Sequence, residues 1–353
     1  MSQRLPAFDK LRVGATFAVI AIHITAAYVL VSPVAYFVNQ LVRFAVPLFI
    51  IMSGFLLYYA DLNTGCLTLT AFYRKRLGRV VGPYILWTLL YGSLNYLVSG
   101  IPHQLLLLLI FWAKHLLWGT AYYHLYFLVI ILQLYVLYPF LRTQLQKRCI
   151  TWLAASFLLT LTTQTFLYLN MMNLITLPVS YQALYLVAFP GWIFYFMLGM
   201  SMALKKDAWE NYLRKHGAFL GLVWLVSLGL LLLDSRLSST YGSSIRPSVI
   251  FYTVSSYFFF YGIALRSYNE MNFWGSWLSQ QSFLIFLMHP LVLTILVFMT
   301  TRLHRPDLWA GTLGMLWLYL ATVAGTLFMT YVASLTPLAG WLGGITQKSS
   351  RRK

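Results

Sequence analysis

The stretch SFLIFLMHPLVLTILVFMT, residues 282–300, decides the fold class because it contains no Asp, Glu, Lys or Arg. A helix rises about 1.5 Å per residue, and roughly 20 apolar residues cross the hydrocarbon core of a bilayer. The apolar residues are continuous rather than alternating, which does not fit a strand of an outer-membrane barrel. We therefore predict a transmembrane helix at this position.

Similar apolar runs recur along the whole chain. They fall at 12–32, 36–60, 80–99, 124–141, 150–170, 184–204, 217–234, 248–265, 282–300 and 309–335. The stretch 105–113 is too short to span and is predicted to be interfacial or re-entrant. The sequence thus predicts an all-α polytopic membrane helix bundle with about ten transmembrane helices. It shows no internal repeat or linker, so residues 1–353 are predicted to form a single integral-membrane domain.

The composition supports the same conclusion. Hydrophobic residues make up 60% of the chain and charged residues only 9%, whereas a soluble domain has about 25% charged residues. This excludes a soluble enzyme, a disordered chain and a disulfide scaffold. The two cysteines, Cys66 and Cys149, are far apart and indicate neither a disulfide framework nor a metal site.

The charge balance is strongly basic, with 25 Lys and Arg against 7 Asp and Glu. In a soluble protein this would suggest nucleic-acid binding. Here the basic residues gather between apolar runs, as the positive-inside rule predicts. With both termini in the cytoplasm, nineteen basic residues fall in inside loops and five in outside loops, Arg246 among the latter. An eleventh span would invert this bias, so we predict ten spans, cytoplasmic termini and no nucleic-acid partner.

Polar residues inside a membrane span are expensive and are candidates for function. His23 lies halfway along the first predicted span, and Arg12 precedes it by eleven residues. Eleven residues turn a helix by about 1100°, so both side chains share one face, about 16 Å apart along the axis. A neutral imidazole can act as a general base or proton carrier. The alternative is a buried histidine satisfied by a neighbouring helix, with Arg12 as an ordinary cytoplasmic anchor.

Carboxylates are scarce within the predicted spans, since every Asp and Glu falls at an end or in a loop. This weakens a proton-coupled transporter interpretation. It also argues against a Ser-His-Asp triad and a metal centre, so no metal is predicted.

Three further arginines draw attention. Arg76 and Arg79 are spaced i, i+3 at the start of the third span, so they share a helix face. Their guanidinium groups suit phosphates, although positive-inside topology alone would also place them there. Arg43 lies about two turns into the second span, where it either snorkels outward or lines a polar cavity. In the same span, Ser53-Gly54 is typical of close helix packing.

Two more histidines occupy suggestive positions. His124 opens the fourth span among tyrosines typical of an interfacial aromatic belt. His289 lies deeper, about 10 Å from the inner edge of the ninth span, and Pro290 is predicted to break the helix just after it. With Arg43, these two histidines are candidates to line a cavity or contact substrate.

Several segments together resemble the acyltransferase-3 family of bacterial integral-membrane enzymes. They are FDKLR at 8–12, the Arg12-to-His23 spacing, VPLFIIMSGF at 46–55, RKRLGR at 74–79, HLYFL at 124–128 and SFLIFLMHP at 282–290. Their order covers nearly the whole chain, which is most similar to single-domain sugar and surface-polysaccharide O-acyltransferases. Two positions depart from the family pattern: Val13-Gly14 stands where Gly should follow Arg12 directly, and Tyr126 stands where Trp is commoner.

The resemblance implies transfer of an acyl group, acetyl in the simplest case, from cytoplasmic acyl-CoA to a hydroxyl of a surface glycan or lipid-linked sugar. It implies that Arg12 and His23 are the essential catalytic pair and that Arg76 and Arg79 lie near the donor's entry. It further implies a multi-pass protein of the bacterial inner membrane that uses acyl-CoA as a substrate and holds no permanent cofactor.

Two other functions stay open at this point. One is a transporter or flippase that exports a glycan or lipid-linked sugar. The other is a non-catalytic membrane partner of a polysaccharide synthase. Export of the glycan or lipid-linked sugar without acyl-CoA would indicate the transporter. A function that does not depend on His23 would indicate the partner of a synthase.

Overall fold

The computed structural model describes residues 5–65, 68–99, 104–178, 182–267 and 271–346. All regular structure within these ranges is helical, which confirms the predicted all-α class. Three features lie outside the described residues: Cys66, and two sets of basic residues counted for the inside loops, Arg4 and those at 348–353.

The helices follow one another with short connections. The first part of the chain contains α1 (Pro6–Thr25), α2 (Pro33–Leu41), α3 (Ala45–Thr64), α4 (Leu69–Ser99), α5 (Leu105–Trp118), α6 (Tyr126–Lys147) and α7 (Cys149–Met171). The second part contains α8 (Gln182–Val187), the 3₁₀ turn η2 (Phe189–Gly191), α9 (Ile193–Leu204), α10 (Lys206–Lys215), α11 (Gly217–Ser238), α12 (Pro247–Arg266), α13 (Phe273–Arg302), η3 (Pro306–Trp309), α14 (Gly311–Ser334) and α15 (Ala339–Leu342).

Seven helical segments are long and apolar enough to cross a membrane, judged by length and composition within the described residues. They are Pro33–Asn63, Tyr126–Lys147, Cys149–Met171, Gly217–Ser238, Pro247–Arg266, Phe273–Arg302 and Gly311–Ser334. The chain is therefore a multi-pass membrane protein. The first helix is long enough, at 20 residues, but carries Asp9, Lys10 and Arg12 in its first two turns. The count of ten spans stays a prediction.

The predicted span 184–204 is wrong as a single helix, because the structure divides it into α8, η2 and α9. Pro190 lies in the break, where its missing N–H and fixed φ disfavour a continuous helix. Side chains from α6 and α7 satisfy the interrupted backbone. Gln133 accepts from the N–H of Phe189, and Thr160 donates to the carbonyl of Pro190. Irregular backbone is tolerated in a membrane protein when it is satisfied in this way.

The predicted break after His289 is also wrong, because α13 continues through Pro290 to Arg302. A proline removes the bond to the carbonyl four residues earlier, which here belongs to Phe286. The side chain of His289 hydrogen-bonds to the carbonyls of Ile285 and Phe286 and so occupies the acceptor that Pro290 leaves open. The helix also begins at Phe273 rather than at 282, so His289 lies near its middle.

The described chain divides into two compact units. We call residues 50–204 with 341–343 the middle unit, and residues 3–49, 205–340 and 344 onward the terminal unit. The single-domain interpretation made from the sequence stays a prediction.

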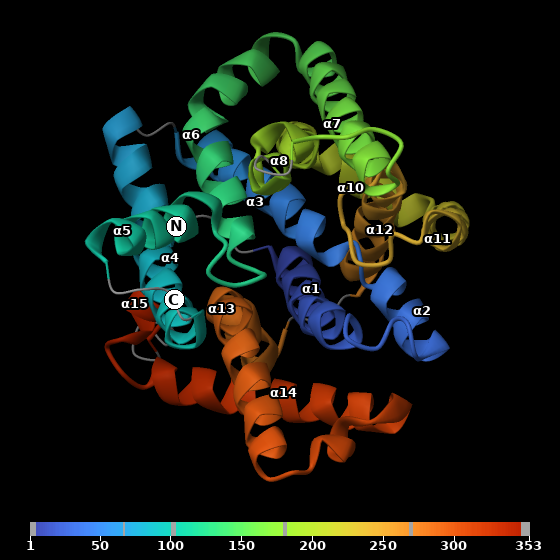
Figure 1. Cartoon of the computed structure of the whole chain (residues 1–353). Helices are drawn as coiled ribbons and strands as arrows, with labels where there is room; N and C mark the ends of the chain where they lie inside the picture. The colour runs from blue at the N-terminus through green and yellow to red at the C-terminus, as the bar shows by residue number, and fades with distance from the viewer. Residues whose placement is uncertain (1–4, 66–67, 100–103, 179–181, 268–270, 347–353) are drawn as a thin grey trace. The chain divides into compact units, whose positions relative to one another are not determined.

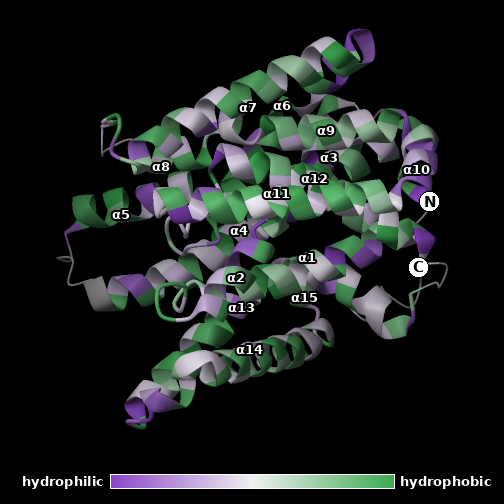
Figure 2. Cartoon of the chain, turned by 90° about the vertical axis from the view of Figure 1, so that its right-hand side faces the viewer, coloured by the Kyte–Doolittle hydropathy of each residue, from purple (hydrophilic) through white to green (hydrophobic). Residues whose placement is uncertain are grey.

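In the terminal unit, hydrogen bonds at both ends of α1 fix its direction relative to its neighbours. Lys10 donates to the carbonyl of Ser267 at 2.7 Å, which places the start of α1 beside the end of α12. Tyr28 donates to the carbonyl of Trp309 at 2.8 Å, which places the end of α1 beside η3 and the start of α14. The helices α1 and α13 lie side by side in Figure 1 and run in the same direction. Figure 2 shows hydrophilic residues gathered on the short helix α10.

In the middle unit, glycines bring α3 and α9 into backbone contact. A Cβ atom added to Gly54 would lie 2.1 Å from the carbonyl oxygen of Phe196. A Cβ atom added to Gly199 would lie 2.0 Å from the carbonyl oxygen of Ile51. Only glycine fits at both positions, which confirms the close packing expected around Ser53-Gly54.

Candidate functional site

We call the line of contact between α1 and α13, from Arg12 and Ser279 to His23 and His289, the seam. One end of the seam holds a charged cluster. Arg12 donates to Ser279 of α13 at 3.2 Å and contacts a carboxylate oxygen of Asp9 at 3.5 Å. Ser279 in turn donates to Asp9 at 2.5 Å. The Arg12 side chain is 27% exposed and the Asp9 side chain 11% exposed. The guanidinium is thus held in a fixed place while part of it remains accessible.

The second level of the same seam holds two histidines. The rings of His23 and His289 stack with their centroids 5.3 Å apart and their planes 23° apart. His289 is fully buried, whereas His23 is half-buried. The sequence placed both residues in spans but gave no reason to pair them. The structure brings them together because α1 and α13 are parallel. His23 follows Arg12 by 11 residues on α1, and His289 follows Ser279, the partner of Arg12, by 10 residues on α13.

The hydrogen bonds of His289 fix its tautomer. A carbonyl oxygen can only accept, so Nδ1 of His289 donates its proton to Ile285, 3.3 Å away. The neutral ring therefore carries its proton on Nδ1 and its lone pair on Nε2.

A buried amide secures the backbone beside His23. Asn39 of α2 donates to the carbonyl of Ile22 at 3.0 Å and to the hydroxyl of Thr25 at 2.8 Å. Both acceptors belong to α1, one of them directly preceding His23. The amide therefore joins α2 to the part of α1 that carries the imidazole.

Arg43 lies in the break between α2 and α3 and is 2% exposed. Its guanidinium donates to the carbonyls of Tyr241 and Gly242 at 2.8 and 2.9 Å, in the connection between α11 and α12. It is also close enough for its charge to act on His23. Arg43 is thus buried among backbone acceptors and does not extend its charge into solvent.

Arg246 forms a second buried arginine site beside Arg43, although the sequence suggested an outside loop. It is fully buried and donates to Gln40 at 2.7 Å and to Asp234 at 3.4 Å. Gln40 also donates to the carbonyl of Tyr241, the acceptor that Arg43 uses. We call Asn39, Gln40, Arg43, Asp234 and Arg246 the buried polar network.

The predicted donor-binding pair lies in the middle unit. Arg76 and Arg79 belong to the first turns of α4, which begins at Leu69, well before the predicted start at residue 80. Arg76 is half-buried and its charge acts on Tyr138 of α6, whereas Arg79 is exposed. Tyr138 donates to Asp61 at 2.6 Å. The two arginines share a helix, but only one of them is near a carboxylate and a phenol.

His124 is buried at the entrance to α6 and is surrounded by aromatic rings. Tyr91, Tyr122 and Tyr123 contact its ring edge to face, with centroids 5.3, 5.9 and 5.7 Å away. This arrangement agrees with the aromatic environment predicted from the sequence, to which Tyr91 of α4 also contributes.

The candidate residues are therefore distributed over both units. Arg12, His23, Arg43 and His289 lie in the terminal unit, and Arg76, Arg79 and His124 lie in the middle unit. Ser279, Asn39 and Arg246 were missed by sequence reasoning. Of the residues around Arg12, only Asp9 gave a sequence signal, through its i, i+3 spacing.

The described residues were also compared with the requirements of a metal site. Within the described ranges, no group of three or more His, Cys, Asp or Glu side chains lies close enough together to hold a metal ion. The chemistry of the seam is thus that of imidazoles, a carboxylate and a guanidinium.

Comparison with known proteins gives one match. A family model described as an acyltransferase domain matches residues 5–335, which include all of the candidate residues above. No curated protein and no solved structure matches the chain.

Proposed function

Because the chain belongs to the acyltransferase-3 family and is a membrane acyltransferase, we propose that it transfers an acyl group, acetyl in the simplest case, from acyl-CoA to a sugar hydroxyl. The proposed acceptor is a surface glycan or a lipid-linked sugar, and the proposed location is the bacterial inner membrane with donor supplied from the cytoplasm. The observation that carries the proposal is the stacked pair of His23 and His289 on a seam that also holds Arg12.

In this proposal His23 is the general base. It takes the proton of the acceptor hydroxyl while the hydroxyl oxygen attacks the thioester carbonyl carbon. The tetrahedral intermediate then collapses, the carbon–sulfur bond breaks, and the proton passes to the departing CoA thiolate. The neutral imidazole of His23 suits the first proton transfer, and the imidazolium that it becomes suits the second. Its half-buried ring is the more accessible of the two histidines.

His289 is proposed as a positioning residue for His23. Its Nδ1 proton is directed to Ile285, so its ring orientation is set by its own helix. Two imidazolium rings at a centroid distance of 5.3 Å would repel, which limits the pair to one positive charge. The ring of His289, stacked on His23, thereby also restricts the orientation of the His23 ring.

Arg12 is proposed to contact the donor. Asp9 and Ser279 hold its guanidinium, and the positively charged side chain is partly exposed, so it can approach a phosphate of CoA. Arg76 and Arg79 are proposed to serve the same donor from α4, on the strength of their charge and shared face. For Arg43 and His124 the proposal is more limited, because Arg43 is enclosed by backbone carbonyls and His124 by tyrosines.

The test measures acyl transfer by the full chain and its variants. Cells that express the protein are compared with cells that lack it, and mass spectrometry detects an added acyl group that mild base removes. We expect His23→Ala to reduce transfer by at least ~100-fold, the usual contribution of a general base. His289→Gln should reduce it less, while His216→Ala, which changes an exposed histidine, should leave it unchanged.

The outcomes separate the proposal from its rivals. An ester that depends on His23 supports acyl transfer and identifies both the acyl group and the acceptor. Full transfer by a correctly folded His23→Ala variant contradicts the proposed base. A change in exported glycan without any ester indicates transport instead.

A further inference from the structure

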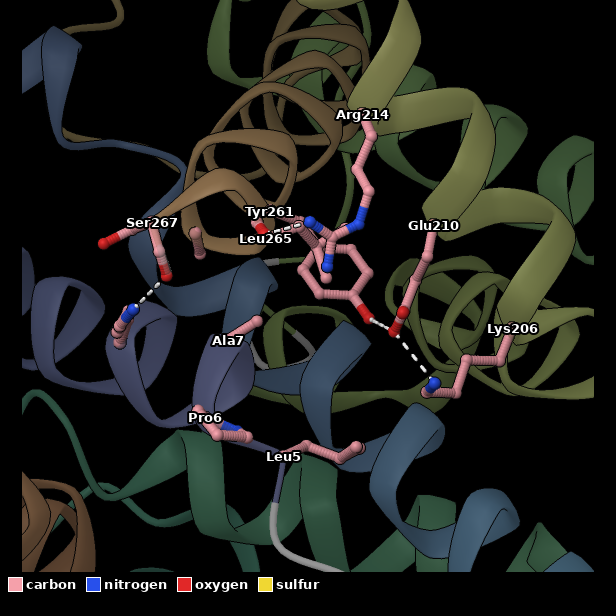
Figure 3. Close-up of a pocket in the computed structure, with 11 residues that line it drawn as sticks. Leu5, Pro6, Ala7, Lys206, Glu210, Arg214, Tyr261, Leu265 and Ser267 are labelled. Atoms are coloured by element: carbon pink, nitrogen blue, oxygen red, sulfur yellow. Dashed lines mark hydrogen bonds and ion pairs between the residues drawn. The ribbon is translucent and has the colours of Figure 1, made fainter. Parts of the chain in front are cut away.

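A cavity of about 270 Å³ lies in the terminal unit where α1 begins and α12 ends. Its walls come from the start of α1, from α10 and from the last turns of α12 (Figure 3). Its volume is close to the lower end of the ~300–1,000 Å³ that small-molecule sites occupy. The cavity does not include Arg12, His23 or any other residue of the proposed acyl-transfer site.

The cavity lining is rich in positive charge. Lys10, Lys206 and Arg214 line it, and Glu210 is the only carboxylate among its described lining residues. Glu210 is already engaged, because Lys206 contacts it at 3.2 Å and Tyr261 donates to it at 2.6 Å (Figure 3). Two positive charges therefore exceed what the carboxylate of Glu210 can balance.

The remaining two cations are held by neutral acceptors. Lys10 donates to the carbonyl of Ser267 at 2.7 Å, and Arg214 donates to the carbonyl of Leu265. A carbonyl oxygen orients a cation without cancelling its charge. Partial burial acts to lower the pKa of Lys206, but Glu210 and Asp207 outweigh it and raise the pKa above the ordinary lysine value. Lys206 is therefore charged at neutral pH.

The start of α1 adds to the positive electrostatic potential of the cavity. Leu5, Pro6 and Ala7 line the cavity, and no side chain caps this helix end. The backbone N–H groups of a first helical turn carry a partial positive charge, which favours anions. Lys10 also lies two residues from Arg12, and two residues turn a helix by about 200°, so the two side chains face different directions.

We propose that this cavity binds a phosphate group. Three charged nitrogens and a helix start match a tetrahedral dianion or diester, and the apolar residues beside them suit the carbon atoms attached to it. The phosphate belongs either to an anionic phospholipid head group at the membrane surface or to a soluble molecule such as CoA. Basic pockets between membrane helices bind lipid head groups in this manner.

The test measures direct binding to the purified full chain in detergent, so it does not depend on acyl transfer. The probes are a short-chain phosphatidylglycerol and free CoA, with short-chain phosphatidylcholine as the zwitterionic comparison. The pocket variant is Lys10→Gln with Arg214→Gln. The matched control is Lys205→Gln with Lys215→Gln, which removes two exposed cations flanking α10 that do not line the cavity.

We expect one phosphate probe to bind and the pocket variant to bind it roughly 20-fold more weakly, about fivefold for each cation. The control variant should change binding by less than about threefold. Charge-conserving Lys10→Arg with Arg214→Lys should retain binding. If the double Gln variant fails to fold, Lys10→Gln alone should show the fivefold loss.

Each outcome decides the proposal. Pocket-dependent binding of phosphatidylglycerol, but not of CoA, supports the site and assigns it to a lipid; the reverse pattern supports it and assigns it to a soluble phosphate. Equal losses in the pocket and control variants, equal binding of phosphatidylcholine and phosphatidylglycerol, or binding of neither phosphate probe would overturn it. The proposed acyl transfer can fail without affecting the difference between the pocket and control variants, because neither variant changes a residue of the proposed acyl-transfer site.

Discussion

The two compact units hold their helices together by different means. In the middle unit, Gly54 and Gly199 let the backbones of α3 and α9 touch. In the terminal unit, the buried polar network joins α2 to α1 and to the connection between α11 and α12. Inside a bilayer no hydrophobic effect drives helices together. The glycine contacts stabilise helix association through van der Waals packing, and the buried polar network does so through hydrogen bonds.

The difference matters because the buried polar network places a charge near His23, the proposed general base. Arg43 belongs to the network and acts on His23 through its charge, and Asn39 holds the carbonyl that precedes His23. The glycine contact fixes distance alone. The unit that carries the histidine pair is thus also the one in which Arg43 and Arg246 are buried.

The largest effect on stability is expected for Arg246→Met. Its removal leaves Asp234 and Gln40 without the guanidinium that they bind, and breaking such a buried pair typically reduces the free energy of unfolding by about 3 kcal/mol or more. Unfolding in detergent measures the change. Arg236→Met is the control, because that exposed arginine only lies over the Tyr36 ring, a contact contributing less than about 1 kcal/mol. Similar losses in both variants would mean that the network is not what stabilises the terminal unit.

The next effect concerns the middle unit. Gly199→Ala places a methyl group 2.0 Å from the carbonyl oxygen of Ile51, so α3 and α9 must separate. We expect the free energy of unfolding to fall by about 1–3 kcal/mol, as overpacking generally does. Gly229→Ala on α11 meets no atom within 4 Å and should be neutral or slightly stabilising. Equal stability of the two variants would contradict backbone contact at Gly199.

A smaller effect is expected for Asn39→Leu. The variant loses two hydrogen bonds to α1, each contributing about 0.6 kcal/mol in a membrane protein, so unfolding should become easier by about 1 kcal/mol. Acyl transfer should fall as well, because the backbone beside His23 is released. Asn63→Leu is the comparison, since Asn63 is exposed and donates to Tyr59 of its own helix. A loss of stability without any loss of transfer would separate Asn39 from the proposed site.

The smallest effect should come from an exposed ion pair. A hydrogen bond from Arg305 lowers the pKa of Asp307 below 3.8, between α13 and α14. The folded state therefore favours the carboxylate, and any stabilisation is present above pH 3.8 and disappears as the pH falls through the lower folded pKa. Melting of Asp307→Asn and the unchanged protein should differ only slightly at neutral pH and converge in acid. A difference as large as that of Arg246→Met would mean that burial does not distinguish these two arginines.

Hydropathy along the chain predicted the fold class and the position of most helices, because each apolar run is a local property. The shared face of Arg12 and His23 was also predictable, since it depends only on helical geometry. The pairing of His23 with His289 was not, because it depends on which helices become neighbours across most of the chain. Nor could hydropathy reveal that Gln133 and Thr160 would satisfy a broken helix at Pro190.

Arg246 also shows that local sequence cannot predict which distant residues will surround a side chain. Its charge and its neighbours in sequence indicated an exposed loop, yet the guanidinium is fully buried because Gln40 and Asp234 converge on it from other elements. Pro290 misled for a related reason. Its effect on the helix depends on the hydrogen bonds of the preceding histidine, which a proline rule does not include.

The parallel seam of α1 and α13 has a consequence for how the protein is made. Arg12 and Ser279 are 267 positions apart, so α1 is synthesised long before α13, the helix that it packs against. A nascent chain that reaches α12 but not α13 already contains His23 but not the ring that stacks on it. The histidine pair therefore assembles only after α13 has been synthesised, and fragments that end before α13 would lack it.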